Sequence, residues 1–183
     1  MTYNNKNYVI GVYRMINQDY FINLAKEKTG NAIQTVAVAA PHDLATLESL
    51  RNAVDLGFTK AILVGDENII TDVAKEGNLD ISDMELVHAD NLADAAQKSV
   101  DQVTAGKASL IMKGLIDTSV ILKAVVKKEN NLRTGKTLSY VGILFNENRD
   151  KYYLSSDGAM LISPDIEQKK GIIENAVDVA HAL

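Results

Sequence analysis

Hydrophobic residues along the chain form short apolar runs that alternate with segments of helical spacing. Each run is bounded by polar or turn-forming residues and predicts a buried strand; the runs are 36–40, 61–64, 85–87 and 109–112. Between and after them, apolar side chains recur every three or four residues, as on one face of a helix; these segments are 44–54, 69–75, 92–103 and 117–125. Strands that alternate with helices through short connections predict βαβ units, and hence an α/β fold with a parallel sheet.

Turn-forming residues mark the ends of the predicted helices. Asp43 precedes the first helix and Gly57 follows it, while Asp90 or Asn91 precedes the third. Asp and Asn side chains accept hydrogen bonds from the free amides at a helix start, and Gly favours the conformation that ends a helix. The expected boundaries therefore agree with the hydrophobic pattern.

The pattern changes after residue 130. Residues 138–145 alternate weakly, 146–150 are polar and 151–154 are rich in β-formers, which predicts a β-hairpin. Ser163-Pro164-Asp165 then predicts the start of a helix, with a buried face formed by Ile166, Ile172, Ile173, Ala176, Val177 and Ala180. In the N-terminal region, only residues 21–26 suggest a helix.

These patterns divide the chain into three parts. We expect an N-terminal extension over 1–35, an α/β domain over 36–132, and a partial second domain over 133–183 that holds the hairpin and one helix. The polar, glycine-containing segment NNLRTGK separates the last two. Because a hairpin and one helix make a poor domain, we expect the chain to be truncated relative to a longer protein.

Composition narrows the classes of protein. Aromatic residues make up only 5% of the chain and Trp is absent, so the core must be aliphatic. The absence of cysteine excludes disulfides, a thiolate zinc site and a Cys nucleophile, and it fits a cytoplasmic protein. No apolar run approaches the roughly 18 residues that span a bilayer. With a net charge of −5 and no basic stripe, we expect neither a membrane nor a nucleic acid as partner.

Several common site motifs are absent. The sequence has no GxGxxG after its first strand, no GxxxxGK[ST], no GxSxG and no HExxH. Its three histidines are not spaced as metal ligands, so we expect no metal site. His42 follows a strand and is a candidate to line a cleft, although residues at strand ends often only satisfy a turn.

The segment IMKGLIDTSVILKAV, residues 111–125, places a lysine, a glycine and two hydroxyls at a strand-to-helix corner. A helix N-terminus offers free amides and a positive dipole end to an anion, Lys113 adds a charge, and Gly114 allows close backbone approach. Thr118 and Ser119 supply hydroxyl donors. The alternative is ordinary helix capping, with Asp117 as the N-cap and Lys113 as a solvated loop residue.

Four stretches in order resemble one family. Residues 110–144, LIMKGLIDTSVILKAVVKKENNLRTGKTLSYVGIL, look like the middle of the phosphate acyltransferases, and more like the phosphate butyryltransferase branch than the phosphate acetyltransferase branch. The stretches 36–43, 61–70 and 155–183 agree with that branch. The resemblance covers nearly everything from Val36 onward, whereas 1–35 match no pattern that we recognise.

The resemblance implies a fold and an activity. Members have two α/β domains, similar in fold to the isocitrate and isopropylmalate dehydrogenases, and usually form homodimers. They transfer an acyl group, here butyryl or similar, between coenzyme A and inorganic phosphate. Coenzyme A is a substrate, and no metal or redox cofactor takes part. A carboxylate deprotonates the thiol, and basic or hydroxyl donors stabilise the developing charge.

The resemblance also implies substrate-binding residues. Its cleft-lining corner falls on Lys113, Gly114, Thr118 and Ser119. Arg133 lies in the segment that leads to the second domain and is a candidate to pair with phosphate, or else is a solvated linker residue. Asp157 and Met160 fall on an Asp-x-x-Met stretch, where Asp157 is either a substrate contact or a turn-former.

At two points the sequence departs from the family pattern, and these departures limit which of the family's residue roles can be assigned here. Leu161 stands where the family usually has Asn, so we expect a polar contact to be lost at this corner. The family's serine, arginine and general-base aspartate lie in a portion beyond these residues, so no catalytic residue is assigned. If the 183 residues are the whole chain, we expect little or no acyl transfer. The alternatives are then a non-catalytic relative that binds coenzyme A or phosphate, or only dimerises, and an acyl-carrier-protein-dependent acyltransferase, which residues 155–170 argue against.

Overall fold

The computed structural model describes residues 18–28, 32–146 and 151–183. They form two compact units, which we describe separately. One unit contains the parallel sheet and ends at Lys136, and the other contains the first helix together with the chain from Thr137 to Leu183. The division of the sequence into 1–35, 36–132 and 133–183 stays a prediction.

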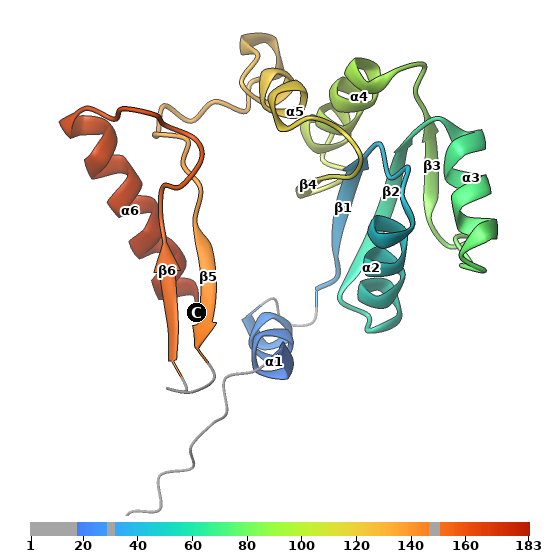
Figure 1. Ribbon diagram of the computed structural model, residues 1–183, viewed down its shortest axis with the longest axis horizontal. Coiled ribbons are helices and arrows are strands. Elements are labelled where there is room, and N and C mark those ends of the chain that lie inside the picture. The colour runs from blue at the N-terminus through green and yellow to red at the C-terminus, as the bar shows by residue number, and fades with distance from the viewer. Residues whose placement is uncertain (1–17, 29–31, 147–150) are drawn as a thin grey trace, which may run out of the picture. The chain divides into compact units, whose positions relative to one another are not determined.

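The first unit is built on a four-stranded parallel sheet (Figure 1). Its strands are β1 (Gln34–Ala39), β2 (Thr59–Gly65), β3 (Glu85–His88) and β4 (Leu110–Lys113), in the order β3-β2-β1-β4. The predicted α/β fold with a parallel sheet is confirmed. The likeness to isocitrate dehydrogenase stays an expectation from the family.

Helices cover both faces of this sheet: α2 (Leu44–Asp55), α3 (Glu67–Glu76), α4 (Leu92–Thr104) and α5 (Thr118–Val125), followed by the short η1 (Lys128–Asn130). Successive side chains of β1 point to opposite faces. Val36 and Val38 pack in a core cluster with residues of α2 and α3, whereas Ala37 and Ala39 pack in another with residues of α4 and α5. The two clusters explain why the strands are apolar on both faces.

The predicted helix starts are confirmed at atomic detail. Asp43 accepts a hydrogen bond from the amide of Thr46, and Asn91, not Asp90, caps α4 by accepting from Asp94. Gly57 and Gly106 follow the ends of α2 and α4 with φ of 66° and 73°, in the left-handed region that glycine favours.

The end of β1 differs from the predicted strand 36–40 by one residue. Ala40 is fully buried but has a φ of 52°, so the strand stops at Ala39. This turn directs the carbonyl of Ala40 to the amides of His42 and Leu115, both at 2.8 Å. The apolar pattern extends beyond the strand because the turn is buried as well.

The second unit contains α1 (Gln18–Lys28), the antiparallel hairpin of β5 (Gly142–Asn146) and β6 (Lys151–Ser155), and α6 (Ile166–Ala182). The hairpin and both helices match the sequence-based predictions, although most of the predicted polar turn, 147–150, lies outside the described residues. Phe21 of α1 packs edge-to-face on Tyr152 of β6, with ring centroids 6.3 Å apart. Asp165 starts α6 in a capping box with Gln168.

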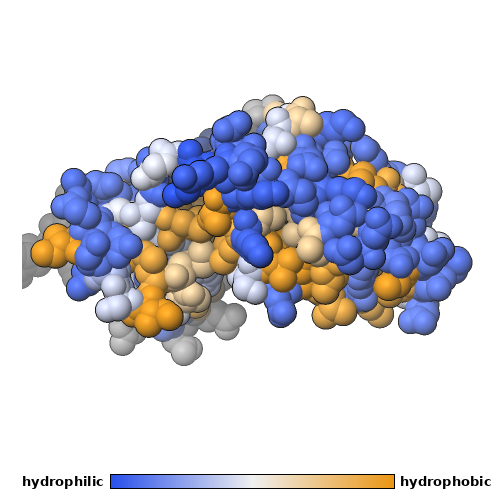
Figure 2. Space-filling view, turned by 90° about the horizontal axis from the view of Figure 1, so that it is seen from above, coloured by the Kyte–Doolittle hydropathy of each residue, from blue (hydrophilic) through white to orange (hydrophobic). Residues whose placement is uncertain are grey.

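The predicted buried face of α6 is wrong for most of its positions. Ile172 is buried, but Ile166 is 80% exposed and Ile173 is 63% exposed. Within this unit, α6 packs along one side of the hairpin (Figure 1), so a single strip of the helix is covered. Hydrophobic side chains also reach the surface elsewhere (Figure 2). None of the helices in the described residues combines the length and the apolarity needed to cross a bilayer.

Candidate functional site

The carboxyl ends of the four parallel strands meet at one edge of the sheet, where ligands bind in open α/β sheets. Polar residues follow each of these strands. His42 follows β1, Asp66 follows β2, Asp90 follows β3, and Lys113 ends β4. The candidate site of the first unit therefore lies along this edge.

Gly114 joins the loop after β4 to the loop after β1. Its amide donates to the carbonyl of Ala39 and the next amide, that of Leu115, donates to Ala40, both at 2.8 Å. A Cβ on Gly114 would overlap the carbonyl oxygen of Ala40 and crowd Pro41. Glycine is thus required for backbone packing between two loops, and its role beside a ligand stays a prediction.

Lys113 is exposed, but its ammonium is not simply solvated. Nζ donates to the carbonyl of Ile116 at 3.2 Å and to that of Gly114 at 3.4 Å. These bonds hold a positive charge over the turn that begins α5. Because an ammonium has three N–H donors, one remains for a ligand.

The N-terminus of α5 differs from the other helix starts in this unit. Asp117 is the N-cap, yet its side chain makes no capping hydrogen bond, whereas the N-caps of α2, α3 and α4 each accept at least one. Side-chain capping by Asp117 is therefore not observed. Thr118 and Ser119 are exposed, and within the described residues their hydroxyls have no protein partner. The positive end of α5 stays open to an anion.

Arg133 and Asp157, the other predicted contacts, lie in different units. Arg133 is exposed beyond η1, and no ion pair joins it to another residue in the part of the chain that the structure describes. The oxygens of Asp157 accept from the amides of Tyr140, Met160 and Leu161 at 2.9, 3.3 and 3.0 Å. Asp157 therefore does serve as a turn-former, and its contact with substrate stays a prediction.

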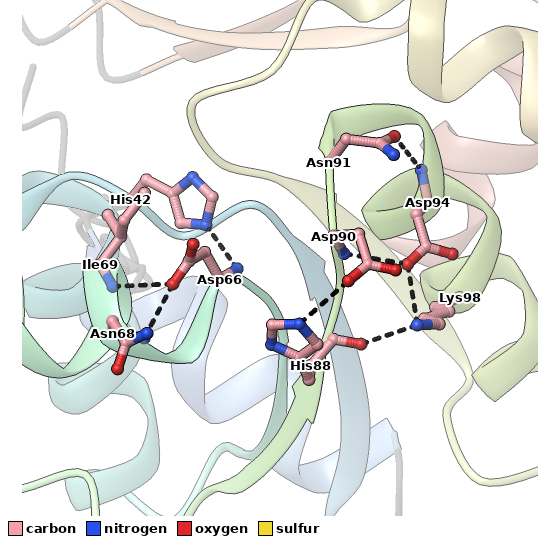
Figure 3. A network of polar contacts seen from close by, with 9 residues as sticks. All are labelled: His42, Asp66, Asn68, Ile69, His88, Asp90, Asn91, Asp94 and Lys98. Carbon is pink, nitrogen blue, oxygen red and sulfur yellow. Dashed lines mark hydrogen bonds and ion pairs between the residues drawn. The ribbon is translucent and has the colours of Figure 1, made fainter.

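His42 bridges the ends of β1 and β2 (Figure 3). Its Nε2 accepts a hydrogen bond from the amide of Asp66 at 3.1 Å, while the carboxylate of Asp66 caps α3. Burial lowers the pKa of His42, and the nearby charges of Asp66 and Asp43 partly offset this effect. The imidazole is consequently neutral at neutral pH.

A second polar cluster lies at the end of β3 (Figure 3). Lys98 of α4 donates to the carbonyl of His88 at 2.9 Å and pairs with Asp94 at 2.8 Å. The hydrogen bond from Lys98 is the main reason that the pKa of Asp94 is lowered. Sequence reasoning missed Lys98 because it lies on a helix, ten residues from His88. The four-residue spacing from Asp94 is the signal that predicts the pair.

Comparison with known proteins decides the family. The family described as phosphate acetyl/butaryl transferase matches residues 89–183, more than half of the chain. The chain belongs to this family. The match includes the β4–α5 corner, Arg133 and Asp157, which confirms the resemblance read from the sequence.

Relatives in the phosphate acetyl/butaryl transferase family include both branches. The chain is 40% identical over 151 residues to a phosphate butyryltransferase of Clostridium acetobutylicum, covering 82% of this chain and 50% of the relative. It is 32% identical over 164 residues to a phosphate acetyltransferase of Rickettsia typhi, covering 90% and 47%. The chain thus spans about half the length of the curated relatives that it matches.

Solved structures support the fold alone. A phosphotransacetylase from Streptococcus pyogenes superposes with a TM-score of 0.75 at 15% identity, over 91% of this chain and 59% of that chain. A branched-chain phosphotransacylase from Enterococcus faecalis V583 superposes with a TM-score of 0.60 at 24% identity, over 81% and 51%.

Proposed function

We propose that the protein acts in the transfer of a short acyl group, butyryl or similar, between coenzyme A and inorganic phosphate. The observation that carries this proposal is membership of the phosphate acetyl/butaryl transferase family through the segment that holds the polar β4–α5 corner. The 40% identity to a phosphate butyryltransferase favours a butyryl-sized group over acetyl.

The β4–α5 corner is the proposed phosphate-binding site. Lys113 supplies a full positive charge at the start of α5, and the side chain of Asp117 leaves the first amides of the helix uncapped. Thr118 and Ser119 add hydroxyl donors beside these amides. A phosphate oxygen is a suitable acceptor for each of these groups. Arg133 is a further proposed contact from the same unit.

The reaction follows from the two substrates. A phosphate oxygen attacks the thioester carbonyl carbon, a C–O bond forms, the C–S bond breaks, and the thiolate of coenzyme A leaves and takes up a proton. In the opposite direction, a carboxylate removes the thiol proton and the thiolate attacks the acyl phosphate. Fixed positive groups stabilise the charge that develops on oxygen. Asp157 is proposed to contact substrate, and no residue is assigned as the general base.

Further features of the proposal concern the setting of the protein. The family's reaction uses coenzyme A as a substrate, without a metal or redox cofactor. We place the protein in the cytoplasm as a homodimer, with no nucleic acid or membrane as partner. The lack of cysteine supports the cytoplasmic location, and the net charge of −5 supports the absence of a nucleic-acid partner.

Two measurements test the proposal on the full chain. Release of free thiol from butyryl-CoA is followed with and without inorganic phosphate, and binding of phosphate is measured by calorimetry. Lys113→Gln should weaken phosphate binding about tenfold, because it removes a charge-assisted hydrogen bond. Lys60→Gln is the matched control, since Lys60 is exposed near the amino end of β2, whereas the proposed site lies at the carboxyl ends of the strands.

The outcomes separate the alternatives. Phosphate-dependent thiol release that falls in the Lys113 variant alone would support acyl transfer at this corner. Binding of phosphate or coenzyme A without any thiol release would favour a non-catalytic binding protein. If neither substrate binds, the proposed function is wrong for this chain.

A further inference from the structure

The ring of His42 is oriented by two contacts at the end of β2. A Cβ placed on Gly65 would lie 2.5 Å from Nε2 and 3.3 Å from Cδ2, so this edge of the ring lies against the backbone of Gly65. The amide of Asp66 donates to Nε2 from the same side. Because Nδ1 is opposite the Nε2–Cδ2 edge, it points away from β2 (Figure 3).

The hydrogen bond from Asp66 fixes the tautomer of His42. Nε2 accepts a hydrogen bond from a backbone amide through its lone pair, so in the neutral ring the imidazole's own proton must be on Nδ1. Within the described residues no acceptor is bonded to Nδ1. Burial, which lowers the pKa of His42, favours this neutral form. The ring thus presents one oriented N–H donor at the carboxyl edge of the sheet.

The charges around His42 select the kind of acceptor. Asp43 and Asp66 face the ring from the starts of α2 and α3, and both carboxylates are bonded to helix amides. Glu67 follows Asp66 on α3. An incoming phosphate would be repelled by these carboxylates, whereas an uncharged carbonyl oxygen would not. Lys113 lies at the end of β4 instead, on the far side of β1 from β2.

We propose that the Nδ1–H of His42 donates a hydrogen bond to an uncharged carbonyl oxygen of the acyl-CoA, either an amide of the pantetheine arm or the thioester. This inference rests on the proposed function. It assigns the two substrates to different parts of the carboxyl edge of the sheet. Phosphate binds at the β4–α5 corner, and the neutral arm of the thioester crosses the ends of β1 and β2. His42 is therefore a positioning residue for the acyl donor.

Nuclear magnetic resonance of the full chain, with ¹⁵N-labelled histidine, tests this directly. We expect the free protein to show the Nδ1–H tautomer of His42. If a pantetheine amide is the acceptor, saturating coenzyme A and saturating pantetheine, which has the amides without phosphate or acyl group, should both shift the Nδ1–H signal. If only butyryl-CoA shifts it, the thioester is the acceptor. Inorganic phosphate should leave the signal unchanged.

Matched variants supply a second measurement. His42→Gln can keep an acceptor for the amide of Asp66 but lacks the oriented Nδ1–H, so its Kd for butyryl-CoA should rise about fivefold while its Kd for phosphate stays the same. His88→Gln is the control, because His88 lies on the same edge at the end of β3 and is not part of the proposed site.

The results distinguish this inference from the proposed function. Binding of butyryl-CoA by calorimetry without any shift of the His42 signal would overturn the role of His42 and leave the proposed function intact. A free protein with the proton on Nε2 would do the same. No binding of acyl-CoA or phosphate by the wild-type chain would overturn both.

Discussion

At the scale of single residues, the predicted site residues also hold the fold together. Gly114 packs its backbone on Ala40, Lys113 donates to two carbonyls of its own turn, and Asp157 accepts from three amides. Binding groups that are fixed by such contacts need little reorganisation when a ligand arrives. Two substitutions measure how much these contacts contribute to stability.

Gly114→Ala should destabilise the protein by about 1–3 kcal/mol, because the added methyl group overlaps the backbone of Ala40 and Pro41. The free energy of unfolding from urea titration measures this cost. Gly158→Ala is the control, since a Cβ there meets no atom within 4 Å and Gly158 has no left-handed φ. Equal stability of the two variants would contradict the backbone contact at Gly114.

Asp157→Asn should lower the Tm at neutral pH, and the decrease in Tm should be smaller in acid. Hydrogen bonds, first of all from the amide of Tyr140, lower the pKa of Asp157. The ionised carboxylate therefore stabilises the fold above its unfolded pKa of about 3.9, and this contribution is lost as the pH falls through the lower folded pKa. Thermal unfolding of both proteins at pH 7 and below pH 3 measures the effect. A difference in Tm that does not shrink in acid would rule out this cause.

At the scale of elements, the helix starts differ in how much their N-cap side chains contribute to the free energy of unfolding. Asp66→Ala should cost about 1 kcal/mol, because its carboxylate accepts from the amides of Asn68 and Ile69. Asp117→Ala should cost clearly less, since Asp117 has the same charge at a helix start in the same unit but makes no capping bond. Urea unfolding of the two variants gives the comparison, and an equal cost would mean that Asp117 caps α5 in solution.

The elements also show what the sequence can predict. Apolar spacing is local, so it located β1 to β4 and the helices between them, and the turn residues located their ends. Burial of α6 depends on the elements that pack against it, which is why Ile166 and Ile173 proved exposed. The sheet order and the bond between His42 and Asp66 join residues far apart in the sequence, so no local pattern predicts them.

At the scale of the whole molecule, the two units differ in how much core they have. Both core clusters consist of residues between Val36 and Ala124, whereas Ile172 is the one buried large hydrophobic residue in the described part of the second unit. A two-stranded hairpin is also marginally stable without further packing. Local stability therefore should differ between the units.

Amide hydrogen exchange followed by mass spectrometry tests this difference. Peptides from β1 and β2 should exchange at least tenfold more slowly than peptides from β5 and β6, because amides in well-packed strands open only on extensive unfolding. The strands are compared within one sample, which removes differences in pH and temperature. Equal protection of the hairpin would show that it is stabilised by packing beyond that described for its own unit.

The backbone bonds from Gly114 and Leu115 to Ala39 and Ala40 have a consequence for substrate geometry. They tie the loop that carries His42 to the turn directly after Lys113, the last residue of β4, through main-chain atoms alone. The spacing between the two proposed contacts is thus set by the polypeptide backbone, and most side-chain substitutions nearby leave it unchanged. On the proposed function, the distance between bound phosphate and thioester is therefore fixed before the substrates arrive, and the protein loses little conformational entropy on binding them.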